Sequence, residues 1–202
     1  MRKHLISSIL AGTLLAVFAV PGFAALNPGA TAPDFTAVAS LAGKDFTFAL
    51  KQALAKGPVV VYFYPAAFTK GCDLEAHTFS THSEQFTTAG VSIIGVSADS
   101  IQRLNAFSSD PEYCAGKFPV ASDPDGRIAA DYGLKMIPPQ KGVVDVRGDT
   151  VTHGFFPRTT FVINRAGKIV ATLSSREDHL TPDEHVTRSL AIVEHMRAAK
   201  GR

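Results

Sequence analysis

The sequence predicts a single α/β domain built on a mixed β-sheet with helices on both faces. Two continuously apolar runs, residues 58–64 and 91–98, are typical of strands that are buried on both sides. A helical pattern over 72–89 joins them, and two buried strands joined by a helix indicate a parallel β-α-β unit. Over 159–173, two more apolar runs flank a glycine-containing turn, which predicts a hairpin that adds antiparallel strands to the same sheet.

The N-terminal 24 residues have the pattern of a secretory signal peptide. Positive residues at 2–4 precede a largely apolar run over 5–20, and Gly22 and Ala24 supply the small side chains of a cleavage site after Ala24. An uncleaved membrane anchor is the alternative, but the run is shorter than the roughly 20 apolar residues that a spanning helix needs. We therefore expect an exported, periplasmic protein.

The mature chain, residues 25–202, is expected to be formally neutral. Removal of Arg2 and Lys3 lowers the number of basic residues from 20 to 18, which equals the 18 acidic residues. Because no basic stripe remains to bind phosphates, neither nucleic acid nor, after signal cleavage, a membrane is expected as a partner. The mature chain has no internal repeat, charge block or low-complexity linker, so we expect one domain.

The first half of this domain can be assigned in order. Residues 47–50 are typical of a strand and run into a short helix that ends at Gly57. The first buried strand follows, and then the helix over 72–89, which Gly90 ends. This helix places two aromatic residues seven positions apart on one face, Phe79 and Phe86.

After the second buried strand, Ser100 is a suitable cap for a helix through about Ser109. A short strand is expected over 118–122, and one or two helical turns over 126–133. The predicted hairpin then leads to the final helix.

The final helix has the clearest start signal in the chain. Thr181 is its expected cap, Pro182 its first residue and Glu184 the acidic partner of the cap. With this helix, the order of elements is of the kind called thioredoxin-like: a mixed sheet in a single domain, flanked by helices on both faces.

Cys72 occupies a position suited to chemistry. It follows a buried strand through a tight loop and lies at the start of a helix, where free backbone N–H groups and the helix dipole favour an anion such as a thiolate. The alternative is structural: Cys72 is then a small buried apolar residue or half of a disulfide with Cys114.

The neighbours of Cys72 resemble a known family. Pro65, Thr69, Cys72 and Glu75 form the pattern P-x-x-x-T-x-x-C-x-x-E after an apolar strand, and "RTTFVIN" begins at Arg158. With the opening "PGATAPDF", these segments are similar to the peroxiredoxins, the alkyl hydroperoxide reductase and thiol-specific antioxidant family. The resemblance is strongest to the branch of peroxiredoxin Q and the bacterioferritin comigratory protein, and it covers nearly the whole mature chain.

The resemblance implies a role for each residue of the pattern. Cys72 would be the peroxidatic cysteine, Thr69 its hydroxyl partner, Pro65 the residue that shapes the loop, and Arg158 the guanidinium beside the sulfur. Negative charge moves along an S–O–O line when a thiolate attacks a peroxide, so fixed donors at the sulfur and at the peroxide are what this chemistry requires. Glu75 either orients Arg158 or is an ordinary solvated acid near a helix start.

The resemblance also raises the question of the resolving thiol, which condenses with a sulfenic acid to form a disulfide. Peroxiredoxin Q-like members often have this cysteine five residues after the first, where this chain has His77. Cys114 is therefore the expected resolver, within a turn rich in Ser, Asp, Pro and Gly. A one-cysteine enzyme with an unreactive Cys114 is the alternative.

The expected function is a thiol-dependent peroxidase. Its substrates would be hydrogen peroxide or small alkyl hydroperoxides, and its electron donor a thioredoxin-like or other thiol reductant, in a monomer or homodimer. No cofactor or metal is implied, and His77 and His82 are too far apart around the helix to bind a metal with Cys72. Two alternatives remain: a thiol-disulfide oxidoreductase, although the chain has no C-x-x-C, and a non-enzymatic module with a structural Cys72–Cys114 disulfide.

Overall fold

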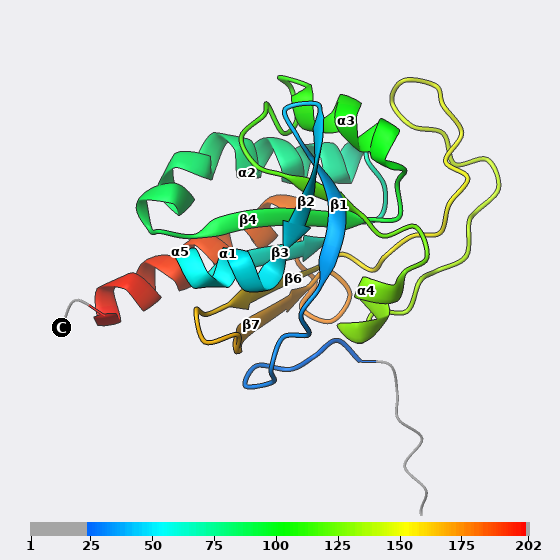
Figure 1. Cartoon of the computed structure of the whole chain (residues 1–202). Helices are drawn as coiled ribbons and strands as arrows, with labels where there is room; N and C mark the ends of the chain where they lie inside the picture. The colour runs from blue at the N-terminus through cyan, green and yellow to red at the C-terminus, as the bar shows by residue number, and fades with distance from the viewer. Residues whose placement is uncertain (1–23, 201–202) are drawn as a thin grey trace, which may run out of the picture.

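A computed structural model of the chain describes residues 24–200 and shows a seven-stranded mixed sheet with helices on both faces (Figure 1). The predicted signal peptide lies almost wholly outside these residues. The strand order in the sheet is β2-β1-β5-β4-β3-β6-β7. The strands are β1 (Thr36–Leu41), β2 (Lys44–Ala49), β3 (Val59–Phe63), β4 (Ser92–Ser97), β5 (Val120–Ser122), β6 (Thr159–Ile163) and β7 (Ile169–Ser174), and the helices are α1 (Leu50–Lys56), α2 (Lys70–Thr88), α3 (Ile101–Ser109), α4 (Arg127–Asp131) and α5 (Pro182–Lys200).

The centre of the sheet confirms the predicted topology. Strands β3 and β4 are parallel and joined by α2, and the β6–β7 hairpin adds β6 antiparallel to β3. All residues of β3 are buried, as its continuously apolar sequence predicts. This strand therefore ends, at Phe63, deep within the molecule.

Two apolar clusters lie on opposite faces of the sheet. One contains Leu50 of α1 and Ala129 of α4, and the other contains Phe79 of α2, Leu104 of α3 and Val186 of α5. Alternate side chains of β3 enter the two clusters, as the period of a strand requires. The candidate site lies where α2 begins on the second face.

Two features differ from the expectations. The strand expected at 47–50 is the end of a β1–β2 hairpin, whose turn places Ala42 and Gly43 at positive φ, 50° and 78°. Helix α2 begins at Lys70 rather than at Cys72, so Cys72 lies inside the first helical turn.

Within residues 24–200, no helix is both long and apolar enough to cross a membrane.

The helix-start prediction for α5 is confirmed. The Glu184 carboxylate accepts hydrogen bonds from the backbone N–H and the hydroxyl of Thr181, both at 2.9 Å.

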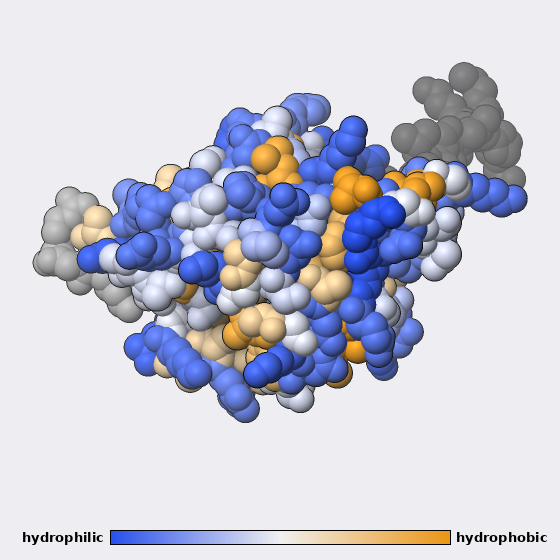
Figure 2. All heavy atoms as spheres, turned by 90° about the horizontal axis from the view of Figure 1, so that it is seen from above, coloured by the Kyte–Doolittle hydropathy of each residue, from blue (hydrophilic) through white to orange (hydrophobic). Residues whose placement is uncertain are grey.

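Hydrophilic side chains cover most of the face shown in Figure 2, with apolar residues in separate small groups. This face has the ordinary exterior of a globular domain.

Candidate active site

The loop between β3 and α2 places Cys72. Thr69 is the N-terminal cap residue of α2, and the backbone N–H of Cys72 donates to the Thr69 carbonyl at 2.8 Å. The hydroxyl of Thr69 does not cap the helix; it donates to the Ala66 carbonyl at 2.7 Å, which folds the loop back on itself. Cys72 is 2% exposed, and Pro65, at the start of the loop, is half-buried. The loop thus encloses the sulfur at the first turn of the helix.

The sheet register brings Arg158 to this loop from far along the chain. Phe63, the last residue of β3, pairs with Thr159, the first residue of β6, so Arg158 lies beside the segment that leaves β3. Its Nη2 donates to the Cys72 Sγ at 3.3 Å, and its Nη1 forms an ion pair with Glu75 Oε2. One guanidinium therefore links the sulfur and a carboxylate that lies one helical turn further along α2.

Gly71 leaves room for this guanidinium. A Cβ at position 71 would lie 3.2 Å from Arg158 Nη2, which is closer than most Cβ contacts allow. A side chain at this position would require the guanidinium to shift by a few tenths of an ångström.

Burial raises the pKa of the Cys72 thiol, while Arg158, the Thr69 side chain and the Ala66 backbone act to lower it. The sequence analysis expected a helix start that favours the thiolate, but in this structure the burial of the sulfur outweighs the groups that lower its pKa. Arg158 still favours the thiolate over the thiol, compared with an equally buried sulfur that lacks a cation.

Glu75 is a buried partner of Arg158 and not a solvated acid. Its side chain is fully buried, and its Oε1 has no hydrogen-bond partner among residues 24–200. Burial raises the pKa of this carboxyl to about 7, and Arg158 opposes the rise. In return, the carboxylate raises the pKa of Arg158, which keeps the guanidinium charged.

Cys114 lies in the turn that follows α3 and is fully buried. Both cysteines are free, and both belong to the same apolar cluster. Burial raises the pKa of the Cys114 thiol well above its ordinary value, and Asp110 and Asp73 add to the effect. The alternative of a structural Cys72–Cys114 disulfide therefore does not describe this form of the molecule.

The two histidines of α2 make local contacts. Nδ1 of His77 lies 2.9 Å from the Glu112 carbonyl, and Nδ1 of His82 lies at the same distance from the Thr78 carbonyl. Among residues 24–200, no group of three or more His, Cys, Asp or Glu side chains is arranged to hold a metal ion.

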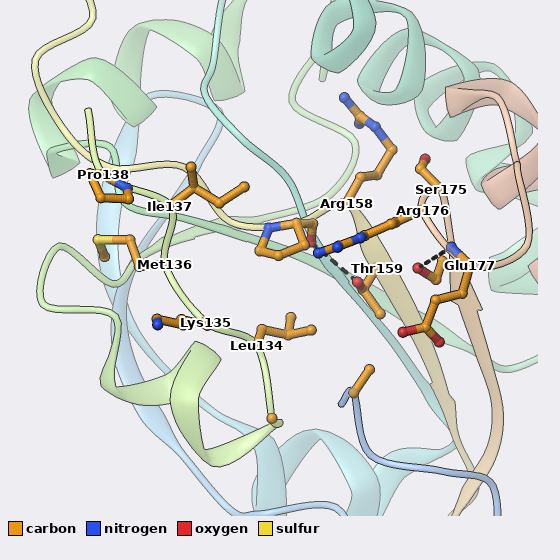
Figure 3. A pocket seen from close by; sticks show the side chains of 14 residues that line it. Leu134, Lys135, Met136, Ile137, Pro138, Arg158, Thr159, Ser175, Arg176 and Glu177 are labelled. Carbon is orange, nitrogen blue, oxygen red and sulfur yellow. Dashed lines mark hydrogen bonds between the residues drawn. The ribbon is translucent and has the colours of Figure 1, made fainter. Parts of the chain in front are cut away.

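A pocket of about 480 Å³ lies next to the backbone of Arg158, between the segment 133–138 and the end of β7 (Figure 3). The Arg158 side chain points away from this pocket, and Cys72 is not among the residues that line it. The pocket is therefore not where a substrate would meet Cys72 in this conformation.

Of the two phenylalanines before Arg158, Phe156 is fully buried. It belongs to the apolar cluster that contains Leu50 and Ala129, and its ring packs against Phe63.

The structure adds a polar cluster that the sequence analysis missed. Arg103 forms ion pairs with Asp99 and Asp145, whose carboxylates are fully buried. Arg103 and Asp99 also hydrogen-bond to the backbone of the loop before Cys72. The only signal in the sequence was an acidic residue, Asp99, immediately after a buried strand. Asp145 lies in a long loop without a recognisable pattern.

A buried cysteine at a helix start, contacted by an arginine on a thioredoxin-like sheet, defines a cysteine-based redox protein. The model of the AhpC/TSA family matches residues 28–172, and the chain belongs to this family. The chain is 31% identical over 169 residues to the chloroplastic peroxiredoxin Q of Arabidopsis thaliana, a match that covers 83% of this chain and 67% of that protein.

Solved structures agree with this assignment. The crystal structure of peroxidoxin BcpB from Mycobacterium tuberculosis superposes with a TM-score of 0.67 at 28% identity, over 84% of this chain and 97% of that one. The bacterioferritin comigratory protein of Xanthomonas campestris has the same fold, with a TM-score of 0.63 at 24% identity, over 86% of this chain and 98% of that one.

Proposed function

We propose that Cys72 is the sulfur with which this thiol-dependent peroxidase reduces its substrate. The observation that carries the proposal is the 3.3 Å contact between Arg158 Nη2 and the Cys72 Sγ, in a site where Thr69 shapes the loop. The family supplies the peroxide as substrate and a thiol as electron donor. The structure supplies the residues to which these roles are assigned.

The chemistry begins with the ionised form of Cys72. The thiolate attacks one peroxide oxygen, an S–O bond forms as the O–O bond breaks, and the other oxygen leaves as water or an alcohol after it takes a proton. Arg158 is charged throughout and holds the sulfur with Nη2, while Glu75 fixes the guanidinium from its other side. Cys72 is left as a sulfenic acid.

Cys114 is the proposed resolving residue. Its thiol attacks the sulfenic sulfur, a disulfide forms and water leaves, and an external dithiol then reduces the disulfide back to two thiols. Because Cys72 is 2% exposed and Cys114 is fully buried, both segments must move before a reductant reaches the disulfide. A one-cysteine cycle, in which an external thiol attacks the sulfenic acid directly, is the competing proposal.

Substrate, location and assembly follow the sequence expectations. Hydrogen peroxide and small organic hydroperoxides are the proposed substrates, because the enclosed sulfur favours small molecules. The signal-like pattern of residues 1–24 supports export to the periplasm. A monomer or a homodimer is proposed for the assembly.

The direct test is peroxide consumption with excess dithiothreitol by the wild type and by Cys72→Ser. We expect turnover in the wild type and only the uncatalysed rate in the variant. Turnover that persists in Cys72→Ser would overturn the proposal, and a wild type that cycles its disulfide without consuming peroxide would favour a thiol-disulfide oxidoreductase.

A further inference from the structure

The loop before Cys72 has a backbone conformation that something must hold in place. Phe68 has a φ of 58°, in the left-handed region that bulky non-glycine residues rarely adopt. Phe68 directly precedes Thr69, the cap of α2, so this conformation sets the direction in which the chain enters the helix. A relaxed Phe68 would move Thr69 and the sulfur of Cys72 together.

Charged side chains bind the backbone of this loop from two sides. The N–H of Ala67 donates to Asp99 Oδ2 at 2.8 Å, and the carbonyl of Ala67 accepts from Arg103 Nη2 at 2.8 Å. The carbonyl of Phe68 accepts from the backbone N–H of Val146 at 2.9 Å. Three backbone polar groups of two consecutive residues, Ala67 and Phe68, are thus bonded to segments that do not contain Cys72.

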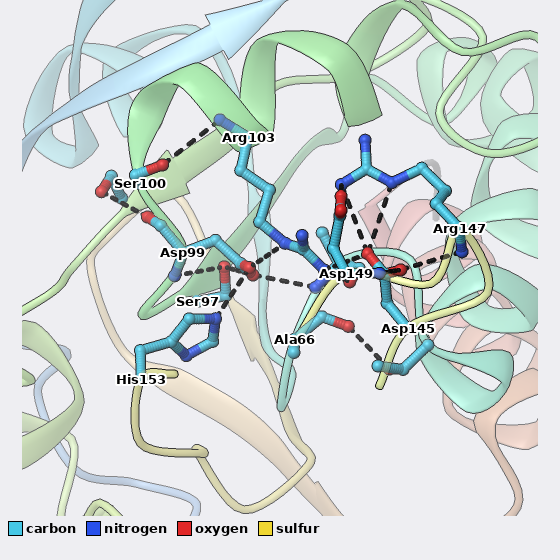
Figure 4. Close-up of polar contacts among 12 residues, drawn as sticks. Ala66, Ser97, Asp99, Ser100, Arg103, Asp145, Arg147, Asp149 and His153 are labelled. Carbon is cyan, nitrogen blue, oxygen red and sulfur yellow. Dashed lines mark hydrogen bonds and ion pairs between the residues drawn. The ribbon is translucent and has the colours of Figure 1, made fainter. Parts of the chain in front are cut away.

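Arg103 connects these segments (Figure 4). Its Nε lies 2.8 Å from Asp99 Oδ1, and its Nη2 lies 2.7 Å from Asp145 Oδ2. The side chains of Asp99 and Asp145 have no exposed surface, and that of Arg103 is 15% exposed. Removal of Arg103 would take one cation from each carboxylate, while Asp99 would keep His153 and the Ala67 N–H and Asp145 would keep Arg147. The contact that has no substitute among those named is the one between Arg103 and the Ala67 carbonyl.

The ring of Phe68 joins the loop to the segment that bears Cys114. Its centroid lies 5.3 Å from the Arg103 guanidinium and 3.4 Å from that of Arg147. The same ring packs edge-on against Tyr113, the residue directly before Cys114, at 5.6 Å between centroids. The position of one side chain therefore affects the surroundings of both cysteines.

We propose that Arg103 is a positioning residue that holds the loop 66–69 closed over Cys72, and that release of its contacts is the opening step that exposes this sulfur to Cys114 or to a thiol. Arg103 contacts neither substrate nor sulfur and acts through the Ala67 carbonyl and the Phe68 ring. The peroxide reaction uses the closed loop, because this is the arrangement in which Arg158 donates to the Cys72 sulfur. The role given to the closed loop rests on the proposed peroxidase function, whereas the opening of the loop does not.

The test measures two rates on one sulfur in Arg103→Met, Arg103→Lys and the control Arg127→Met. Arg127 is the control because its side chain is 86% exposed and contacts only Asp125 among the ion pairs of residues 24–200. The first rate is the reaction of reduced Cys72 with hydrogen peroxide in rapid mixing. The second is alkylation of Cys72 by iodoacetamide, followed by mass spectrometry of the peptide that contains it.

Arg103→Met is expected to react with peroxide about tenfold more slowly and to be alkylated about tenfold faster, which corresponds to a hundredfold change in the closed-to-open ratio, or about 2.7 kcal/mol toward the open loop. Arg103→Lys keeps the charge but not the two-sided contacts and should lie between Arg103→Met and the wild type in both rates. Arg127→Met should match the wild type. If Arg103→Met does not fold, Asp145→Asn, which removes one partner of Arg103, should shift both rates in the same directions.

Equal rates in Arg103→Met and Arg127→Met, or two rates that fall together, would overturn the proposal. A wild type that does not react with peroxide would instead contradict the proposed function. In that case the alkylation rates still decide whether Arg103 holds the loop.

Discussion

Replacement of Arg158 by methionine separates catalysis from stability at this site. The substitution removes the donor 3.3 Å from the Cys72 sulfur and leaves Glu75 buried without its cation. A fixed hydrogen-bond donor beside a reacting charge typically stabilises the transition state by about 3 kcal/mol. The second-order rate constant with hydrogen peroxide should therefore fall roughly 100-fold to 1000-fold. A buried ion pair broken on one side typically costs about 3–5 kcal/mol of stability, so the melting temperature should fall as well.

A second substitution distinguishes the two effects. The pKa of Glu75, already raised by burial to about 7, rises further without Arg158, so the buried carboxyl takes up a proton. Arg158→Met combined with Glu75→Gln removes the unpaired acid altogether. The double variant should regain most of the lost stability and none of the lost rate, because the sulfur still lacks its cation.

The assay is rapid mixing of reduced protein with hydrogen peroxide, together with thermal melts by circular dichroism. Gln85→Met, an exposed substitution elsewhere on α2, is the matched control. A rate constant of Arg158→Met within about threefold of the wild-type value would refute the argument that Arg158 assists the sulfur. Recovery of the wild-type rate constant by the double variant would refute it as well.

Three further predictions address other parts of the molecule. His185 is buried, with its ring nitrogens 2.9 Å from two hydroxyls, and desolvation lowers its pKa to about 4. Because His185 is protonated at a higher pH in the unfolded chain than in the folded one, the free energy of unfolding should decrease by at most about 3 kcal/mol as the pH falls from about 6.5 to 4, measured by urea titration. His185→Gln should remove this pH dependence, and the exposed control His195→Gln should retain it. An unchanged pH dependence in His185→Gln would contradict the assignment. Thr69→Val should lower the peroxide rate about tenfold with little change in melting, because the hydroxyl bond that folds the loop is lost; an unaltered rate would exclude this role. Cys114→Ser should leave a persistent sulfenic acid after one equivalent of peroxide, detected by dimedone labelling and mass spectrometry, whereas the same persistence in the wild type would favour the one-cysteine cycle.

The sequence predicted those parts of the fold in which local pattern and tertiary environment agree. The apolar run of β3, the hairpin of β6 and β7 and the start of α5 at Thr181 all have signals that neighbouring residues carry. Strand β1 was missed because its small and polar residues alternate only weakly, and the Ala42–Gly43 turn is recognisable mainly from its positive φ angles.

The candidate site was predicted unevenly for a related reason. The resemblance identified Cys72 and Arg158, and the pairing of β3 with β6 explains how they meet. The pKa of Cys72 depends on how completely the loop excludes water, which the sequence does not encode locally. The contacts of Arg103 join segments that are far apart in the chain, so they become visible only after folding.

The most direct test of the central claim is a single turnover of reduced protein with one equivalent of hydrogen peroxide, quenched within milliseconds and mapped by mass spectrometry. The account predicts that a sulfenic acid, trapped as its dimedone thioether with loss of water, appears first on the Cys72 peptide and before any disulfide with Cys114. A sulfenic acid that appears first on Cys114, or peroxide that disappears without a change at Cys72, would contradict it.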